Sequence, residues 1–208
     1  MNPVPAIARL TRWLQARQPA RPLKGLTRFT RTVDARLPAY QSDVRLPSGV
    51  VMPLDNRVPA QQSILYSGLY DVALAHVIRQ HTPPGAHALD IGANLGFFAL
   101  HLAQWAGVNG RVAAFEANPA MLTAVRRALA LNPHLRVELL PNAIHAENGA
   151  LTFHIDADPG KSSLLADQVR QPLHTLTVDA ITVDHYIGAA GWSRLDVIKC
   201  DIEGGDCY

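Results

Sequence analysis

The sequence predicts an α/β protein built on a doubly wound, mostly parallel sheet. Between residues 87 and 140, short apolar runs alternate with single segments of helical periodicity, and glycine, proline or asparagine separates them. Strands that alternate with single helices form parallel sheets, because each helix carries the chain back across the sheet. We expect strands at 87–91, 111–116, 137–140 and 195–201, and a domain that is truncated after this fourth core strand.

Three further elements are expected before the alternating region. Apolar residues spaced for one helical face predict an amphipathic helix over residues 4–17. A Pro-Ser-Gly turn between two apolar runs predicts a hairpin over 43–55. Residues 61–81 carry one long apolar stripe, which predicts a single helix.

The regular alternation is interrupted between residues 149 and 187. Two segments there alternate apolar and polar residues, which is typical of strands with one buried face. We interpret them as an inserted pair of strands joined by the polar loop 156–163.

Charge is distributed unevenly along the 208 residues. Residues 1–40 carry +7 and the remainder carries −5, which gives the net charge of +2. We expect residues 1–40 to form a basic N-terminal extension and residues 41–208 to form the main domain. An acidic main domain argues against nucleic-acid binding. The basic arm is suited to peripheral contact with an anionic membrane surface, and the alternative is a solvated tail.

Composition also bears on cellular location. No run approaches the roughly eighteen uncharged apolar residues of a membrane span. Arginines interrupt the first seventeen residues, so we expect no secretory signal there. Two cysteines are too few for a disulfide framework. We therefore expect a cytoplasmic protein.

The strongest candidate for a binding site follows the first strand of the alternating region. Asp90 lies at the strand end, and Gly92 and Gly96 bracket a short loop before the next helix. Ligands of open parallel sheets bind at the carboxyl ends of the strands. An acid there suits an ammonium group, and a helix N-terminus suits a carboxylate. S-adenosylmethionine carries both groups.

A second acid extends this site. Glu116 ends the second strand, twenty residues after Gly96, where a carboxylate can accept hydrogen bonds from both hydroxyls of a ribose. The main rival is a nicotinamide-dinucleotide site. Its G-x-G-x-x-G pattern requires glycine where this chain has Asn94, and Asp90 would repel a pyrophosphate.

Several motifs resemble the FkbM family of S-adenosylmethionine-dependent methyltransferases. The clearest are LDIGANLGFFALHLA at 89–103, GRVAAFEANPAML at 110–122 and VIKCDIEGGD at 197–206. The resemblance implies a Rossmann-like fold and methylation of hydroxyl groups on glycans or small molecules. It implies that Glu116 holds the ribose. The remaining residues implied in cofactor binding are Asp90, Gly92, Ala93, Asn94 and Gly96 for the methionine part, and Asn142 and Ala143 beside the adenine. One departure is Ala117, where the family usually has proline.

The reactive end of the site is expected on the fourth strand. Lys199, Asp201 and Glu203 are spaced two apart, so a continuing strand would place them on one face. Asp201 or Glu203 is proposed as the base or as a clamp on the acceptor. Lys199 would pair with one of these acids or hold an acceptor oxygen, and the alternative is a purely structural ion pair. We expect no metal, although Asp201, Glu203 and Asp206 are oxygen ligands of the kind that magnesium accepts.

Two functions of different class follow from the sequence. The first is an O-methyltransferase with a glycan or small-molecule acceptor. The second is a non-catalytic or incomplete cofactor-binding remnant of such an enzyme, because we expect the second half of the sheet to be missing.

Overall fold

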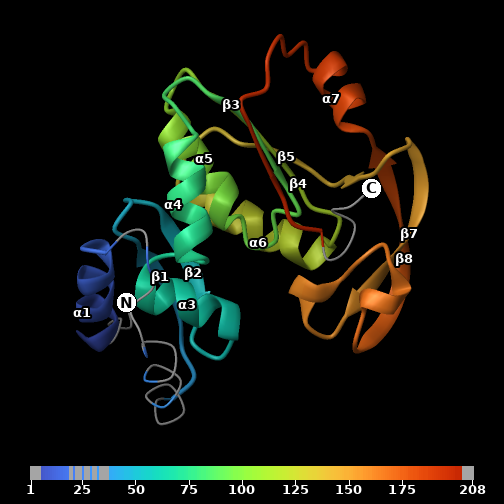
Figure 1. Cartoon of the computed structure of the whole chain (residues 1–208). Coiled ribbons are helices and arrows are strands. Elements are labelled where there is room, and N and C mark those ends of the chain that lie inside the picture. Colours follow the sequence, from blue (N-terminus) through green and yellow to red (C-terminus); the bar gives the residue numbers. More distant parts are fainter. Residues whose placement is uncertain are drawn as a thin grey trace. The chain divides into compact units, whose positions relative to one another are not determined.

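The computed structural model describes residues 6–18, 21, 25, 29, 32 and 38–202. The chain forms two compact units, residues 1–81 and 82–208. Figure 1 shows their elements in sequence colours. The expected separation of a basic extension, residues 1–40, from the main domain stays a prediction.

Among its described residues, the first unit contains three helices and one hairpin. Its elements are α1 (Ala6–Ala16), β1 (Gln41–Arg45), β2 (Val51–Asp55), α3 (Pro59–Ser67) and α4 (Val72–Gln80). The predicted N-terminal helix and hairpin are both confirmed, and β1 pairs antiparallel with β2.

The buried face of α1 differs from the apolar stripe in the sequence. Its buried residues are Ala8, Thr11, Arg12 and Gln15. Leu10 and Leu14 are exposed instead. The Arg12 guanidinium donates a hydrogen bond of 3.0 Å to the carbonyl of Leu65 in α3, so a polar contact fixes this face.

The single helix predicted over 61–81 is wrong, because the chain forms α3 and α4 with a break between them. Gly68 ends α3 in the left-handed conformation, with φ 81°, and its N–H bonds to the carbonyl of Ile64. Asp71 then caps α4, accepting a hydrogen bond from the Leu74 N–H. A helix-ending glycine followed by an N-cap aspartate outweighs a continuous apolar stripe.

The second unit contains the predicted parallel sheet. Its core elements are β3 (His87–Ile91), α5 (Phe97–Ala106), β4 (Arg111–Phe115), α6 (Pro119–Ala130), β5 (Glu138–Leu140) and β9 (Val197–Cys200). The strand order is β5-β4-β3-β9, with every neighbouring pair parallel. The predicted α/β class is confirmed. β3 and β4 are the central pair of this sheet, so the carboxyl ends of these two parallel strands lie side by side.

Both faces of this sheet are covered. On one face, Leu89, Ile91 and Phe115 pack against Tyr186 and Trp192, which lie in or just after α7 (Val183–Ala189). The other face is lined by a cluster of small residues, Ala93, Ala99 and Ala114. Small side chains there allow α5 to lie close to the strands, and α5 is buried along most of its length.

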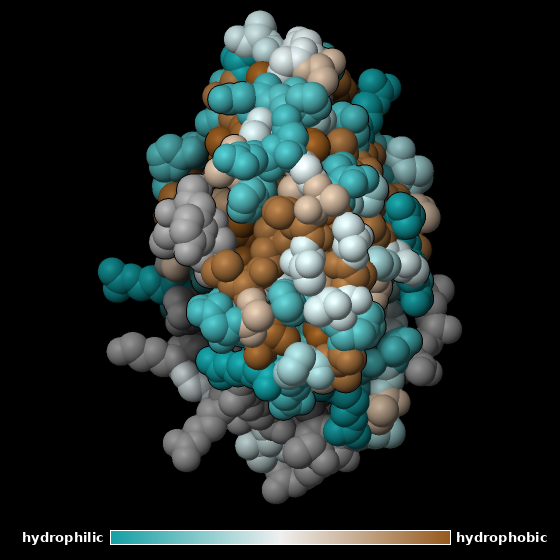
Figure 2. All heavy atoms as spheres, turned by 90° about the vertical axis from the view of Figure 1, so that its right-hand side faces the viewer, coloured by the Kyte–Doolittle hydropathy of each residue, from teal (hydrophilic) through white to brown (hydrophobic). Residues whose placement is uncertain are grey.

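The predicted inserted pair of strands is confirmed, and it belongs to a second sheet. That sheet contains β6 (Ala143–Ile144), β8 (Pro172–Ile181) and β7 (Gly149–Asp156) in that order. β7 and β8 are antiparallel. The connection between them includes two short 3-10 turns, η1 (Pro159–Lys161) and η2 (Ala166–Gln168). Figure 2 shows the side of the molecule that carries this sheet in Figure 1, with apolar side chains gathered at its centre.

Two elements of this region were not predicted. β6 is only two residues long, too short for a periodic signal. Helix α7 has a recognisable start, because Thr182 caps it by accepting a hydrogen bond from the His185 N–H. That cap was the available signal for α7, but the helix is also only seven residues long.

Candidate cofactor site

The glycine loop, residues 92–96, follows β3 and lies next to the end of β4. The N–H groups of Gly92 and Ala93 both donate to the carbonyl of Phe115, at 3.0 and 2.9 Å. Gly92 has φ 72°, and a Cβ added to it would collide with the carbonyl oxygen of Asp201. Gly96 has φ 78° and begins α5 close to Val125 of α6. The loop is therefore held between the ends of β4 and β9.

We expect Gly92→Ala to destabilise the second unit by more than the usual cost of a non-glycine residue at positive φ, which is about 1–3 kcal/mol. The added Cβ meets backbone, which cannot move aside as a flexible side chain can. Thermal unfolding of both proteins measures the loss.

Gly191→Ala is the matched control, because Gly191 has φ 62° and open space around its missing Cβ. Equal losses in the two variants would contradict a role for close packing at Gly92.

Glu116 is fixed by two backbone donors from different segments. Its Oε2 accepts the N–H of Asn94 at 2.7 Å, and its Oε1 accepts the N–H of Asn118 at 2.8 Å. Asn94 itself is in the left-handed conformation, with φ 51°, a conformation that asparagine tolerates better than most residues. Each carboxylate oxygen keeps a second acceptor position. Glu116 therefore lies ready to accept further hydrogen bonds beside the glycine loop.

The environment of Glu116 also changes its acidity. The side chain is 8% exposed. Burial raises the pKa of Glu116, and the N–H groups of Asn118 and Asn94 oppose this rise without cancelling it. The charges of Asp90 and Lys199 also act on the pKa of Glu116, which places the three groups in one electrostatic neighbourhood.

Asp90 lies on the α5 face of β3 and is completely buried. Its register partner on β9 is Lys199, whose Nζ lies 3.1 Å from Asp90 Oδ1. Burial raises the pKa of Asp90, and Lys199 opposes the rise. Among the described residues, neither carboxylate oxygen of Asp90 has a well-aligned hydrogen-bond donor, although the Ala99 N–H is near enough to lower the pKa.

Lys199 connects Asp90 to the glycine loop. Its Nζ donates to the carbonyl of Gly92 at 2.8 Å and, more weakly, to that of Ile91 at 3.4 Å. Burial lowers the pKa of Lys199, but the charges of Asp90 and Asp201 outweigh it, and the net shift is upward. The Lys199 ammonium group therefore lies next to the glycine loop. Of the two alternatives from the sequence, this geometry favours the structural ion pair, formed with Asp90 rather than with the acids that follow.

Two further predicted residues, Asp201 and Asn142, follow strands of the parallel sheet. Asp201 follows β9, is exposed, and donates its backbone N–H to the carbonyl of Ile91 at 3.1 Å. Glu203 lies outside the described residues. Asn142 follows β5 and donates from Nδ2 to the carbonyl of Asp179 at 3.3 Å. Ala143 is buried in the core of the second sheet.

Three residues near the site were not predicted from the sequence. Asn118 caps α6 by accepting the Ala120 N–H, and its own backbone N–H also fixes Glu116. Gly160 and Ser162 lie in the connection between β7 and β8, yet approach Asn94 and Asn118. No periodic pattern marks them, so only the three-dimensional arrangement identifies them.

The FkbM methyltransferase domain pattern matches residues 90–207, more than half of the sequence. The chain therefore belongs to the FkbM methyltransferase family. The match includes every residue of the candidate site. No curated protein matches the chain significantly.

Solved methyltransferases resemble parts of the chain. A Clostridium thermocellum protein proposed to be an rRNA methylase is 25% identical over 34% of this chain and 40% of that one, with a TM-score of 0.32. An Aquifex aeolicus SAM-dependent methyltransferase is 24% identical over 31% and 35%, with a TM-score of 0.30. Coclaurine N-methyltransferase is 14% identical over 72% and 57%, with a TM-score of 0.31. The chain thus spans less than two thirds of each of these proteins.

Within the part of the chain that the structure describes, no helix is long and apolar enough to cross a membrane. Within the same residues, no group of three or more histidine, cysteine or acidic side chains is placed to hold a metal ion. Two of the oxygen ligands considered for magnesium, Glu203 and Asp206, are outside those residues.

Proposed function

We propose that this chain carries the cofactor-binding site of an S-adenosylmethionine-dependent O-methyltransferase. The observation that carries the proposal is the Glu116 carboxylate, fixed by the N–H groups of Asn94 and Asn118 beside the glycine loop, with an acceptor position left on each oxygen. A ribose diol presents two donors at the spacing of a carboxylate. Glu116 would hold the ribose, and the glycine loop would hold the methionine part.

The same geometry argues against the dinucleotide rival. A pyrophosphate needs free backbone N–H groups at the glycine loop. The N–H groups of Gly92 and Ala93 are donated to Phe115, and that of Asn94 is donated to Glu116. The nearby carboxylates of Asp90 and Glu116 would repel its charge.

Asp90 supports the site differently from the sequence interpretation. A direct pair between its carboxylate and the cofactor ammonium stays a prediction, because Asp90 is fully buried and already faces Lys199. Its role in our proposal is to hold Lys199, and through Lys199 the Gly92 carbonyl, in place. The placement of Asn142 and Ala143 beside the adenine also stays a prediction.

When bound, S-adenosylmethionine supplies a methyl group and a good leaving group in one molecule. The protein must then orient the acceptor and take up its proton. Asp201 is exposed at the end of β9 and can receive the hydroxyl proton as the oxygen is methylated. Glu203 is the second candidate for this base. The acceptor is proposed to be a hydroxyl of a glycan or small molecule, in the cytoplasm.

Isothermal titration tests the cofactor assignment. We expect the chain to bind S-adenosylmethionine and S-adenosylhomocysteine and to bind NAD much more weakly. Equal affinity for NAD would refute the assignment. The remnant alternative predicts binding without methyl transfer to any hydroxyl acceptor, which a radiolabelled-methyl assay on glycan and small-molecule pools would detect.

Cofactor affinity should depend on pH through Glu116. The ionised carboxylate is the form that accepts both ribose hydroxyls, and burial raises the pKa of Glu116 above the ordinary range of about 4.3–4.5. Affinity for S-adenosylhomocysteine should therefore be full at neutral pH and fall on acidification, starting at a higher pH than an exposed glutamate would give.

Titrations between pH 8 and pH 5, with circular dichroism to verify folding, measure this dependence. Glu116→Gln should remove most of it, and any residual dependence would report on Asp90, whose pKa is also raised. An unchanged pH profile in Glu116→Gln would contradict the role of Glu116.

A further inference from the structure

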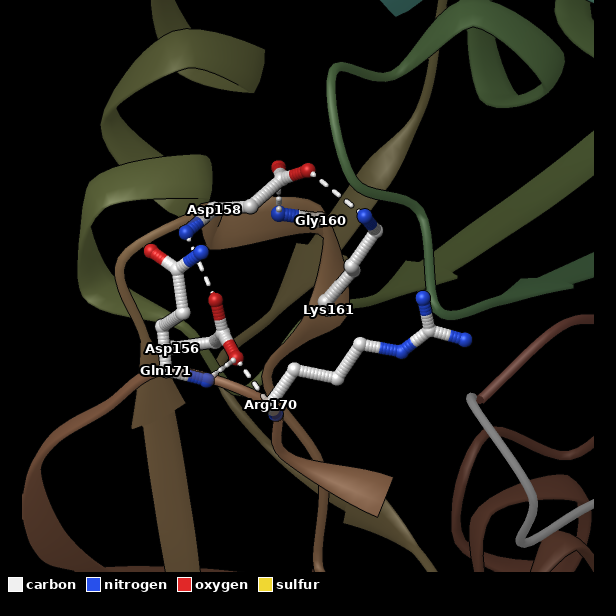
Figure 3. A network of polar contacts seen from close by, with 6 residues as sticks. All are labelled: Asp156, Asp158, Gly160, Lys161, Arg170 and Gln171. Atoms are coloured by element: carbon white, nitrogen blue, oxygen red, sulfur yellow. Dashed lines mark hydrogen bonds and ion pairs between the residues drawn. The ribbon is translucent and has the colours of Figure 1, made fainter.

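The connection between β7 and β8, residues 157–171, approaches the cofactor site from the second sheet. Gly160 lies so close to Asn94 that a Cβ on it would be 2.9 Å from the Asn94 Nδ2. Two residues later, the Ser162 hydroxyl accepts a hydrogen bond of 3.2 Å from the Asn118 Nδ2. Figure 3 shows this connection beside the green segment that links β3 to α5.

The two residues contacted are the same two that fix Glu116. Asn94 and Asn118 each donate a backbone N–H to one oxygen of that carboxylate, and each presents its side-chain amide to the β7–β8 connection. The connection therefore contacts both asparagines that hold the Glu116 carboxylate. A change in Gly160 or Ser162 would act on the carboxylate through these asparagines.

The connection is also held by hydrogen bonds to a carboxylate at its start. Asp156, which is buried at the end of β7, accepts the backbone N–H groups of Asp158, Arg170 and Gln171. These bonds join the beginning of the connection to its end, as Figure 3 shows. They also hold the pKa of Asp156 below its usual range.

The part of the connection nearest the site is fixed in a similar way. Asp158 caps η1 through the N–H of Gly160, and the Ser162 hydroxyl also accepts the N–H of Asp156 at 3.1 Å. Gly160 and Ser162 are thus placed by hydrogen bonds inside the connection.

We propose that the β7–β8 connection is the supporting wall of the ribose subsite, with Gly160 and Ser162 as positioning residues that set cofactor affinity through Asn94, Asn118 and Glu116. This inference rests on the proposed function. It assigns the inserted sheet a role in cofactor binding, in addition to its place in the fold.

Titration of S-adenosylhomocysteine into four variants tests the proposal. Ser162→Ala removes the acceptor for the Asn118 amide and should weaken binding about threefold to tenfold, the value of one hydrogen bond. Ser162→Thr keeps the hydroxyl and should restore affinity. Gly160→Ala forces the Asn94 amide to move and should weaken binding similarly. Gly188→Ala is its control, because a Cβ there meets open space.

A double-mutant cycle separates positioning from general stability. The loss caused by Ser162→Ala should shrink below about twofold in a Glu116→Gln background, because residues that act as one unit are not additive. The same loss in both backgrounds would overturn the proposal, as would wild-type affinity in Ser162→Ala and Gly160→Ala. Failure of the wild-type chain to bind would instead overturn the proposed function and this inference together.

Discussion

Replacing Lys199 with methionine should lower the free energy of unfolding of the second unit by about 3–5 kcal/mol. The substitution keeps the volume of the side chain but leaves the completely buried carboxylate of Asp90 without the cation 3.1 Å away. It also removes the donor to the Gly92 carbonyl. Removing one partner of a buried ion pair is costly because the remaining charge has lost its solvation and its partner.

The deficit of Lys199→Met should depend on pH with a defined sign. Burial already raises the pKa of Asp90, and loss of Lys199 removes a group that opposes this rise. A buried acid with a raised pKa costs stability only where it is forced to ionise, so the penalty grows as the pH rises through the ordinary range of aspartate and above. Chemical denaturation should therefore show a smaller deficit at pH 5 than at pH 7.

Lys161→Met is the matched control for this prediction. Lys161 pairs with Asp158 at 3.4 Å, but both side chains are about half exposed, and such pairs contribute about 0–1 kcal/mol. Asp90→Asn combined with Lys199→Met should recover part of the loss, because no unpaired charge remains. A Lys199→Met variant no less stable than Lys161→Met would show that Asp90 does not depend on Lys199.

Glu116→Ala should weaken binding of S-adenosylhomocysteine by about 1–3 kcal/mol, which is roughly fivefold to more than a hundredfold in the dissociation constant. The variant loses the acceptor for the ribose hydroxyls. It also frees the N–H groups of Asn94 and Asn118, so the glycine loop loses its tie to the turn after β4. Isothermal titration measures the change.

Glu147→Ala removes a carboxylate from an exposed turn of the same unit and should leave affinity unchanged. If Glu116→Ala bound the cofactor as tightly as Glu147→Ala, the ribose assignment would be lost. The melting temperature of Glu116→Ala, measured alongside, distinguishes loss of a ligand contact from loss of the fold.

The core strands and their order of appearance were predictable because each has a strong local signal. β3 was predicted at its observed bounds, since an apolar run is bounded by a turn and by Gly92. The second unit's helices α5 and α6 begin where the sequence places a glycine and an Asn-Pro cap. By contrast, the break between α3 and α4 depended on Gly68 and Asp71, and the long apolar stripe across them concealed it.

The candidate site was predictable only in part, for a physical reason. Asp90, the glycine loop and Glu116 lie at strand ends, which parallel topology brings together whatever the rest of the fold. The partner of Lys199 depended on the register of β3 against β9, which no local pattern specifies. Gly160 and Ser162 reach the site through a connection between two strands of another sheet, and sequence spacing carries no information about that approach.

A crystal structure of this chain with S-adenosylhomocysteine would test the cofactor site directly. The site described here predicts both ribose hydroxyls within about 2.5–3.0 Å of the Glu116 carboxylate oxygens, the range of O–H···O hydrogen bonds. It predicts the amino-acid end of the ligand over the glycine loop. A ribose that makes no contact with Glu116, or a ligand bound away from the ends of β3 and β4, would contradict it.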